Sequence, residues 1–567
     1  MRYSELVEIY ERLEKTGSKL EKTAIIAEVL KKSNPDLLPN IVSLLMGRVY
    51  PIWTMIELGV ASQLMIRAIA RAYGVSTDDV EKKSKELGDL GSVAEFFASK
   101  RKQITLAKKT LDVKDVFDIL QDIARQTGKG SQDRKLNLIV QLLAAAKPKE
   151  ARYIVRTVLE ELRVGVAEGL VRDAIAEAFK LDVDDVESAW AVLPDYAEIA
   201  KIVKESGLTG LKRIQLKPGR PFQVLLAEKV PDLKTGLEAF ERCILEFKYD
   251  GARTLIHKDG QKIWIFTRRM EDVTAAFPDL VELARDCIKA EKAIIDSETI
   301  GINPKTGRPV PFQMLSTRIK RKYEIEKATK EIPVQVNAFD IVYLEGKSLF
   351  DKSLEERRRL LEKVIKVIPG KFQIAEGLIT KDYAKAEAFY KKAQAAGQEG
   401  LIVKNLEARY VPGRRVAGGW LKVKPTLENL DLAVIGGLWG TGKRAGWIGS
   451  LILGCRDPES GGFLECGMLG TGIKEKKTTP EDVTFDDITK MLRPHIEWEK
   501  GHQIKIKPKL VIEVAYEEIQ KSPAYSSGFA LRFPRFIRLR PDKGPEDVDT
   551  LERIKRLFEM QRGRKKA

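Results

Sequence analysis

The sequence predicts a multidomain protein with an all-α N-terminal domain, an α+β middle domain and an all-β C-terminal domain. Its 567 residues exceed what one hydrophobic core usually supports. Apolar spacing changes from helical to alternating near residue 212, and closely spaced strand patterns with Gly-rich turns begin after residue 425. We therefore expect domains at 1–212, 213–425 and 426–567.

The first domain is expected to consist of packed amphipathic helices. Apolar residues recur at three- and four-residue spacing, as in LNLIVQLLAAAKPKEARYIVRTVLEELRVG at 136–165, which is the spacing of one helix face. LKPGRPF at 216–222 brings Pro and Gly to the point where this pattern changes. No internal repeat or low-complexity segment is predicted anywhere in the chain.

Short β-rich runs alternate with helical stretches between about 240 and 425. CILEFKY, TLIHK, KIWIFT and AIIDSETI predict strands, and SLEERRRLLEKVIKVI predicts a helix, a mixture typical of an α+β domain. Farther on, DLAVIGGLW, WIGSLILGC, GFLECGML, KLVIEVAYEEI and RFIRLR predict a small barrel of the OB type. A short helix and a basic tail are expected to follow.

Composition narrows the class of function. The formal net charge of +17 favours a polyanionic partner, because Lys and Arg that neutralise phosphates release counterions. Heavy use of Lys and Glu also resembles hyperthermophile proteins. Four cysteines without C-x-x-C spacing and only three histidines argue against a disulfide framework, a zinc site and a Ser-His-Asp triad. No apolar run indicates a membrane span or a signal peptide, so we expect a location in the cytosol or nucleoid, or in a nucleus. We also expect a monomer.

EFKYDGAR at 246–253 carries the clearest chemical motif. A strand is expected to end at Tyr249, with Asp-Gly as the turn and a return strand from Thr254. Alone, this would describe an ordinary hairpin with a surface lysine. K-x-D-G-x-R, with Lys248 and Arg253 at its ends, nevertheless resembles the nucleotide-accepting motif of the covalent nucleotidyltransferases, the superfamily of DNA ligases, RNA ligases and capping enzymes.

Six later segments resemble further motifs of that superfamily and occur in its order. They are 267–269 (TRR), 297–298 (SE), NAFDIVYL (337–344), EGLIVK (399–404), WLKVKP (420–425) and LRFPRFIRLRPDKGPE (531–546). KPKEARYIVR and LRVGVAEGLVRDAI resemble the DNA-binding domain of archaeal and eukaryotic replicative ligases. The whole chain thus resembles an ATP-dependent DNA ligase of that type, with helical DNA-binding, adenylation and OB-fold domains.

The resemblance implies nick sealing in replication, repair and recombination through AMP carried on Lys248. A lysine amine attacks phosphorus only when neutral, and nearby cations favour the neutral form. We expect Arg253, Lys422 and Lys424 to supply these cations. The other residues expected on ATP or AMP are Glu246, Arg268, Glu298, Phe339, Arg538, Asp542 and Lys543.

Adenine and metal binding each have candidate residues. Phe339 matches the family's adenine-stacking aromatic, although a plain core role is the alternative for a residue in a buried strand. The backbone near Glu246 is expected to face the base edge. Glu298 and Glu399 are the candidate ligands of Mg²⁺, or of Mn²⁺, because such cations prefer carboxylate oxygens. Preference among ATP, ADP and GTP stays open.

Two C-terminal segments allow further predictions. In 535–540, strand alternation puts Arg538 and Arg540 on one face, and Ile537 and Leu539 on the packed face. GLWGTGKR at 437–444 nearly matches a P-loop, but Arg444 replaces the required Ser or Thr and a strand pattern follows instead of a helix. We therefore interpret this segment as a Gly-rich hairpin.

Duplex contacts are expected in the helical domain. The candidates, which gather near helix ends and the small turn at 162–165, are Lys147, Lys149, Arg152, Arg156 and Arg163. A solvated helix face is the alternative for each. The Gln103 region lies where archaeal relatives carry a sliding-clamp motif, but it lacks the paired aromatics of that motif. An RNA ligase or capping-type enzyme, and a non-catalytic DNA-binding scaffold, remain alternative functions.

Overall fold

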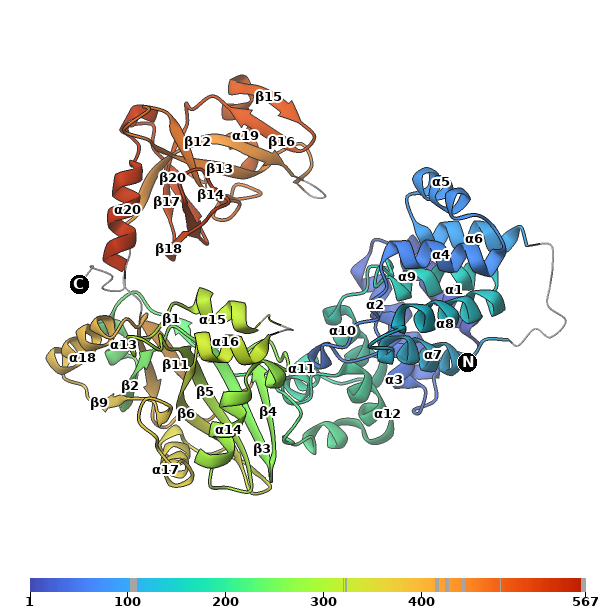
Figure 1. Ribbon diagram of the computed structural model, residues 1–567, viewed down its shortest axis with the longest axis horizontal. Helices are drawn as coiled ribbons and strands as arrows, with labels where there is room; N and C mark the ends of the chain where they lie inside the picture. The colour runs from blue at the N-terminus through green and yellow to red at the C-terminus, as the bar shows by residue number, and fades with distance from the viewer. Residues whose placement is uncertain are drawn as a thin grey trace. The chain divides into compact units, whose positions relative to one another are not determined.

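A computed structural model describes residues 1–101, 110–319, 321, 324–413, 418–423, 428–440, 444–479 and 481–561. The chain forms two compact units, and Figure 1 labels helices and strands of both. The first contains residues 1–228, 251–375 and 405–420, and the second contains residues 229–250, 376–404 and 421–567. In the described ranges, no helix has the length and apolar content needed to cross a bilayer.

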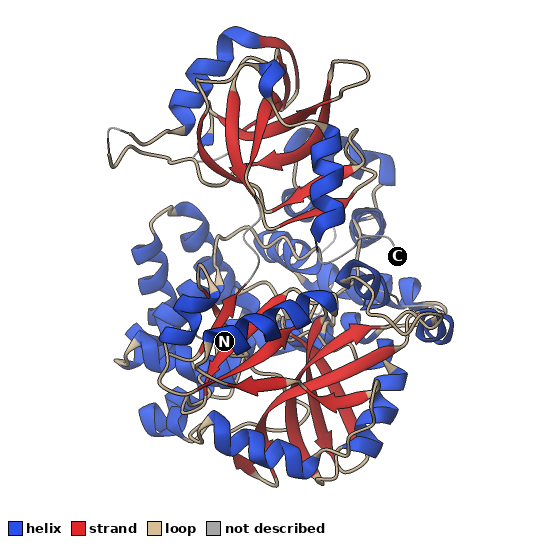
Figure 2. Cartoon of the chain, turned by 90° about the vertical axis from the view of Figure 1, so that its left-hand side faces the viewer, coloured by secondary structure: helices blue, strands red, loops and turns tan. Residues whose placement is uncertain are grey.

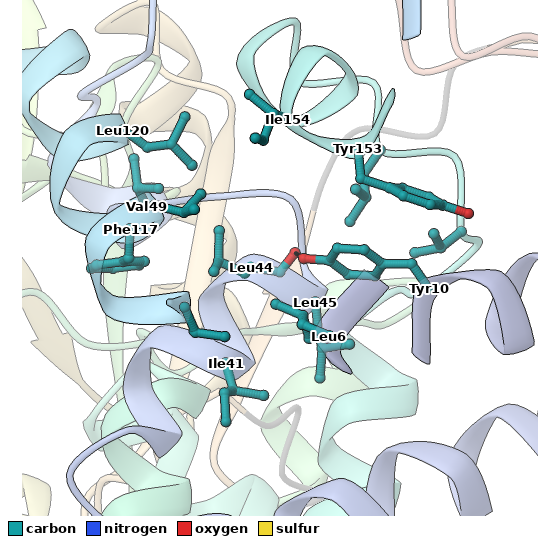
Figure 3. Packing of buried hydrophobic residues seen from close by; sticks show 14 of the residues in the cluster. Leu6, Tyr10, Ile41, Leu44, Leu45, Val49, Phe117, Leu120, Tyr153 and Ile154 are labelled. Atoms are coloured by element: carbon teal, nitrogen blue, oxygen red, sulfur yellow. Dashed lines mark hydrogen bonds between the residues drawn. The ribbon is translucent and has the colours of Figure 1, made fainter. Parts of the chain in front are cut away.

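The N-terminal part of the first unit is helical, as predicted. Its α-helices within the described residues are α1 (Tyr3–Lys15), α2 (Lys19–Lys32), α3 (Leu38–Leu45), α4 (Ser62–Tyr73), α5 (Thr77–Leu87), α6 (Leu90–Ser99), α7 (Val113–Arg125), α8 (Ser131–Ala145), α9 (Pro148–Val158), α10 (Glu168–Phe179), α11 (Val183–Val192) and α12 (Tyr196–Lys212). Their apolar faces form one core. In Figure 3, the rings of Tyr10 and Tyr153 lie side by side in it, with centroids 5.0 Å apart.

The helical domain contains an internal repeat, so the prediction of none was wrong. Helices α1–α6 and α7–α12 follow one another in the same order, with α2 packed on α10 and α8 on α4, and with α3 packed on α12 and α9 on α6. Residues 59–80 align with 165–186, and half of the aligned residues are identical. The two starts meet at the antiparallel bridge Arg2–Asp112. The helices of the two copies interleave, so each copy completes the other's core.

A six-stranded sheet forms the rest of the first unit. Its strands are β3 (Ala252–Asp259), β4 (Lys262–Thr267), β5 (Lys292–Gly301), β6 (Val334–Leu344), β7 (Lys347–Ser348) and β8 (Phe372–Ile374), in the order β4-β3-β5-β6-β7 with β8 parallel to β6. The helices α14 (Pro278–Cys287), α15 (Phe312–Ile319), α16 (Ile325–Glu331) and α17 (Leu354–Val364), labelled in Figure 1, accompany it. Figure 2 shows the helices and strands of the chain in separate colours. Alternate residues of β3, β5 and β6 bury an aliphatic core against these helices.

His257 in β3 gives stability a pH dependence. It is fully buried between Phe222 and Phe266, its Nδ1 accepts a hydrogen bond from the backbone N–H of Gly219, and burial lowers its pKa from 6.5 to about 3. Below pH 6.5 the imidazole of His257 therefore binds a proton in the unfolded chain but not in the folded chain. Stability falls as pH decreases through this window, by up to about 1.4 kcal/mol per pH unit.

This dependence is measurable as the change in unfolding free energy between pH 7 and pH 5. We expect His257→Gln to lose about 2 kcal/mol less than wild type over that interval. His502→Gln is the control, because His502 is exposed. Equal losses in wild type and His257→Gln would contradict the assignment.

The second unit begins with a five-stranded sheet. It has the order β1-β11-β10-β2-β9, formed by β1 (Glu228–Lys229), β2 (Cys243–Lys248), β9 (Gly377–Ile379), β10 (Gly400–Asn405) and β11 (Trp420–Val423). Helices α13 (Leu233–Glu238) and α18 (Tyr383–Ala395) accompany it. The expected hairpin at Asp250-Gly251 is wrong, because β2 and β3 belong to different sheets. Gly251 is required where the chain leaves β2, since a Cβ there would lie 2.4 Å from the carbonyl oxygen of Thr299.

The C-terminal part of the second unit is the predicted strand-rich domain. Its strands are β12 (Leu430–Trp439), β13 (Ile448–Arg456), β14 (Phe463–Leu469), β15 (Ile496–Lys500), β16 (Gln503–Ile506), β17 (Val511–Ala515), β18 (Glu518–Lys521), β19 (Phe529–Arg532) and β20 (Arg535–Leu539), with helices α19 (Phe485–Leu492) and α20 (Leu551–Met560). Strand β12 pairs antiparallel with β13, as expected for a hairpin rather than a P-loop. Gly442 and Lys443 of that segment lie outside the described residues.

Strand β20 departs from the predicted alternation. Between the pairs Glu513–Arg538 and Val514–Phe536 its register shifts, so Ile537 has no partner on β17. Such a bulge resets which side chains face inward. Phe536 is consequently buried and Ile537 is 44% exposed, so the assignment of Ile537 to the packed face is corrected.

Candidate active site

The proposed nucleophile Lys248 is the last residue of β2. Its Nζ lies 2.6 Å from Oε2 of Glu399, and both side chains are mostly buried, with 20% and 15% exposed. The backbone N–H of Glu399 also donates to the carbonyl of Lys248, and Oε1 of Gln398 accepts from the N–H of Asp250. The residues before β10 therefore fix both the backbone and the amine of the lysine motif.

A second ion pair joins β2 to β10. Lys404 of β10 contacts Oε2 of Glu246 at 2.5 Å, and their side chains are 2% and 3% exposed. Strand alternation places Glu246 and Lys248 on the same face of β2. The sequence did not predict a role for Lys404, although Lys404 is the last residue of the EGLIVK segment. This buried ion pair therefore joins β2 to β10 two residues before Lys248.

Arg253, from the other unit, is held by a closed set of hydrogen bonds. Its Nε and Nη2 donate to Asp296 at 2.9 and 2.6 Å, and its Nη1 donates to the carbonyl of Leu225 at 2.6 Å. The Tyr410 hydroxyl donates to Asp296 at 2.8 Å and accepts from the N–H of Leu225. Burial disfavours the guanidinium charge, but Asp296 outweighs it and raises the pKa of Arg253.

Two aromatic rings accompany this arginine. Phe339 and Trp420 pack edge to face with centroids 5.6 Å apart, and the Arg253 guanidinium lies 5.5 and 5.3 Å from their ring centres. Phe339 falls at a register shift between β5 and β6, opposite the step from Asp296 to Ser297. A bulge can re-aim a side chain, so the ring of Phe339 does not follow the regular alternation of a buried strand. Trp420 was missed, although it begins WLKVKP.

The remaining described candidates of the middle domain lie in β5, just after β4 and in β11. Glu298 is half-buried and directly opposite Arg253 in the β3–β5 register. Arg268 is exposed just after β4, and Lys422 lies in β11. Lys424 lies outside the described residues. The gathering of cations around Lys248 thus stays a prediction, and the group that the structure places beside its amine is the carboxylate of Glu399.

The last motif is held by carboxylates of its own domain. Arg540 and Lys543 each contact Asp431 at 2.7 Å. Arg538, which is 64% exposed, contacts Glu513 at 2.6 Å. A hydrogen bond from Arg540 lowers the pKa of Asp542 from 3.8 to about 2. These cations therefore have intramolecular anionic partners that a phosphate would have to replace.

Comparison with known proteins decides the family. Residues 224–424 match the family model for the ATP dependent DNA ligase domain, 2–176 match that for the DNA ligase N terminus, and 444–543 match that for the ATP dependent DNA ligase C terminal region. The DNA ligase of Nanoarchaeum equitans is 48% identical, with 99% of each chain covered. The chain belongs to the ATP-dependent DNA ligase family.

Other relatives agree with this assignment. The DNA ligase of Thermococcus onnurineus is 44% identical over 99% of this chain and 98% of its own. The solved structure described as "Pmar-Lig_Pre." is 16% identical, with a TM-score of 0.54 over 94% of this chain and 99% of its own, which supports the fold alone. The predicted family and fold class are confirmed, and nothing in these matches supports an RNA ligase, a capping enzyme or a scaffold.

Glu298 and Glu399 are the two carboxylates that the sequence predicts as metal ligands. Among the described residues, no three His, Cys, Asp or Glu side chains gather as a metal site. Mg²⁺ is usually held by one or two carboxylates together with substrate phosphates and water. Glu298 and Glu399, which belong to different units of the chain, each offer carboxylate oxygens of the kind that this mode uses.

The predicted DNA contacts of the helical domain divide by exposure. Arg156 is buried and forms ion pairs with Asp89 and Glu14 at 2.8 and 3.1 Å, so the structure gives it a packing role, and its contact with DNA stays a prediction. Arg152, 22% exposed, also contacts Glu14. The exposed candidates are Lys147, Lys149 and Arg163, and Arg163 contacts Glu161. Gln103 lies outside the described residues.

Proposed function

We propose that the chain seals nicks in duplex DNA through AMP carried on Lys248. Family membership supports ATP-dependent ligation. The single observation that supports Lys248 as the carrier is its mostly buried amine, fixed at 2.6 Å from Glu399 at the end of a strand. A neighbouring carboxylate can act as the base that takes up the proton of an attacking amine, which is one of the ways in which a nucleophile is activated.

Three displacements at phosphorus account for the reaction. The neutral Lys248 amine attacks the α-phosphate of ATP, a P–N bond forms, and pyrophosphate leaves. An oxygen of the 5′-phosphate at the nick then attacks the AMP phosphorus and breaks the P–N bond. Finally the 3′-hydroxyl attacks the 5′-phosphorus, a phosphodiester forms, and AMP leaves with the bonding electron pair. The proton lost by the amine in the first step and by the 3′-hydroxyl in the last passes to solvent or to a nearby carboxylate, such as Glu399 in the first step. The lysine nitrogen takes up a proton when its bond to phosphorus breaks in the second step.

The other predicted site residues have distinct proposed roles. Arg253, fixed by Asp296, would neutralise phosphate charge at a preset position. Phe339 and Trp420 would offer apolar surface to the adenine ring. Arg538, Asp542 and Lys543 would close on the pyrophosphate during the first step and exclude water. Residues 1–212 would grip the duplex, 213–425 would hold the nucleotide and 426–567 would close over it.

Labelling with α-³²P-ATP tests the proposal. We expect one acid-labile label per chain, mapped by peptide mass spectrometry to Lys248, and its discharge by nicked duplex DNA with release of AMP. Nicked duplex RNA is the comparison substrate and should discharge the label far more slowly. A label on another residue, or equal discharge by both substrates, would overturn the carrier or the substrate respectively.

A further inference from the structure

Two turns of the helical domain are held in the same unusual way. Residues 57–61 and 163–167 occupy equivalent places in the two copies of the internal repeat. Each has a left-handed glycine, with φ of 61° at Gly59 and 68° at Gly165. The burial of successive residues is also the same, because Leu58 and Val164 are buried and the following glycines and alanines are exposed.

A buried lysine from the opposite copy supports each turn. Nζ of Lys135 donates to the carbonyls of Leu58 and Gly59 at 2.6 and 3.5 Å. Nζ of Lys22 donates to the carbonyls of Val164 and Gly165 at 2.6 and 3.4 Å. The two lysines are equivalent within α8 and α2, and they are only 7% and 9% exposed.

These ammonium groups contact backbone carbonyls rather than carboxylates. In the part of the chain that the structure describes, no carboxylate lies within ion-pair distance of Lys22 or Lys135. Burial without such a partner lowers the pKa of Lys135. A buried charge is costly unless it is compensated. The carbonyl oxygens compensate each charge in part, and an anion at the exposed surface of the turn would compensate it further.

The absence of a side chain at both glycines leaves room for the lysine ammonium groups. A Cβ at Gly165 would lie 2.4 Å from Nζ of Lys22, and one at Gly59 would lie 2.9 Å from Nζ of Lys135. The turns lead into α4 and α10, and their N-cap residues Ala61 and Ala167 provide no capping side chain. The first backbone N–H groups of both helices thus stay available on the exposed side of the turns, with a lysine charge beneath.

We infer that residues 57–61 form a second duplex-contacting turn, equivalent to 163–167, and that Lys135 and Lys22 are the positioning residues that hold the two turns toward DNA phosphates. The inference rests on the proposed duplex binding by the helical domain. The turns differ in two respects. Glu57 stands where the other copy has Arg163, and the N–H of Leu58 donates to Oε1 of Glu160 at 3.1 Å. The turn at 57–61 therefore acts through its backbone and the charge of Lys135.

Binding of nicked duplex DNA to the full chain, measured from 0.05 to 0.3 M salt, tests this inference. We expect Lys22→Met and Lys135→Met each to weaken binding roughly five- to ten-fold and to reduce the slope of log affinity against log salt by about one. Lys31→Met is the matched control, since Lys31 is exposed and lies on the opposite face of α2 from Lys22. The double variant should combine the two effects, because the turns are separate contacts.

Two further measurements separate positioning from folding. Self-adenylylation reports on the rest of the chain and should be unchanged in every variant. Lys135→Gln can still donate to the carbonyl of Leu58 but lacks the charge, so it should reduce the salt slope while keeping the turn folded. Unchanged affinity and slope in folded Lys135→Met would overturn the inference for the second turn. Failure of wild type to bind the nicked duplex would instead overturn the proposed function.

Discussion

Replacing Lys248 with alanine should reduce self-adenylylation by on the order of a thousand-fold or more, because no other group can form the P–N bond in its place. Alanine also removes the partner of Glu399, whose carboxylate is 15% exposed. Lys248→Arg separates these effects. A guanidinium keeps a positive charge near Glu399, but it stays protonated and is not a nucleophile.

Both variants should fail to accept label from α-³²P-ATP, whereas Lys234→Ala should be labelled like wild type, since the Lys234 side chain is 74% exposed on α13. Both should still seal a nick supplied with a pre-adenylated 5′-phosphate, because the third displacement uses the 3′-hydroxyl rather than the lysine. Labelled Lys248→Arg would show that another residue carries AMP. Loss of sealing on the pre-adenylated nick would show that Lys248 also acts in the last step.

Much of the fold could be predicted because its signals are local. The helical pattern at 136–165 corresponds to α8 and α9 in the structure. It could be recognised because the spacing of apolar residues along a helix does not depend on distant partners. The strand patterns from 243 to 300 became β2 to β5 for the same reason. The internal repeat was harder to recognise, because half of its aligned residues differ and what the copies share is mainly the position of helices and turns.

The errors arose where distant parts of the chain decide the outcome. An Asp-Gly pair after β2 resembled a hairpin turn, yet β2 pairs with β9 more than a hundred residues later. Bulges at Phe339 and Ile537 depend on their partner strands and leave no mark on the alternation. Ion pairs are equally long-range, so motif spacing predicted Lys248 but not that Glu399 lies beside its amine.

The acid that holds Arg253 should matter for both stability and catalysis. Asp296 is fully buried and accepts hydrogen bonds from Arg253 and Tyr410. Asp296→Asn keeps the shape but leaves the buried guanidinium without its counter-charge, which we expect to cost about 3–5 kcal/mol in the free energy of unfolding. Tyr410→Phe removes only the hydroxyl and should cost about 1–3 kcal/mol. Denaturant unfolding at pH 7 measures both.

A double variant separates the effect of this ion pair on folding stability from the effect of Arg253 on nucleotide use. Arg253→Met combined with Asp296→Leu removes both charges, so much of the folding stability should return, as it does when buried ion pairs are replaced by apolar residues. The double variant should nevertheless keep a raised KM for ATP in self-adenylylation, because the preset positive charge is gone. If ATP use returns together with stability, Arg253 only supports the fold. If stability returns alone, the network of Asp296, Tyr410 and Leu225 exists to aim one guanidinium at the nucleotide.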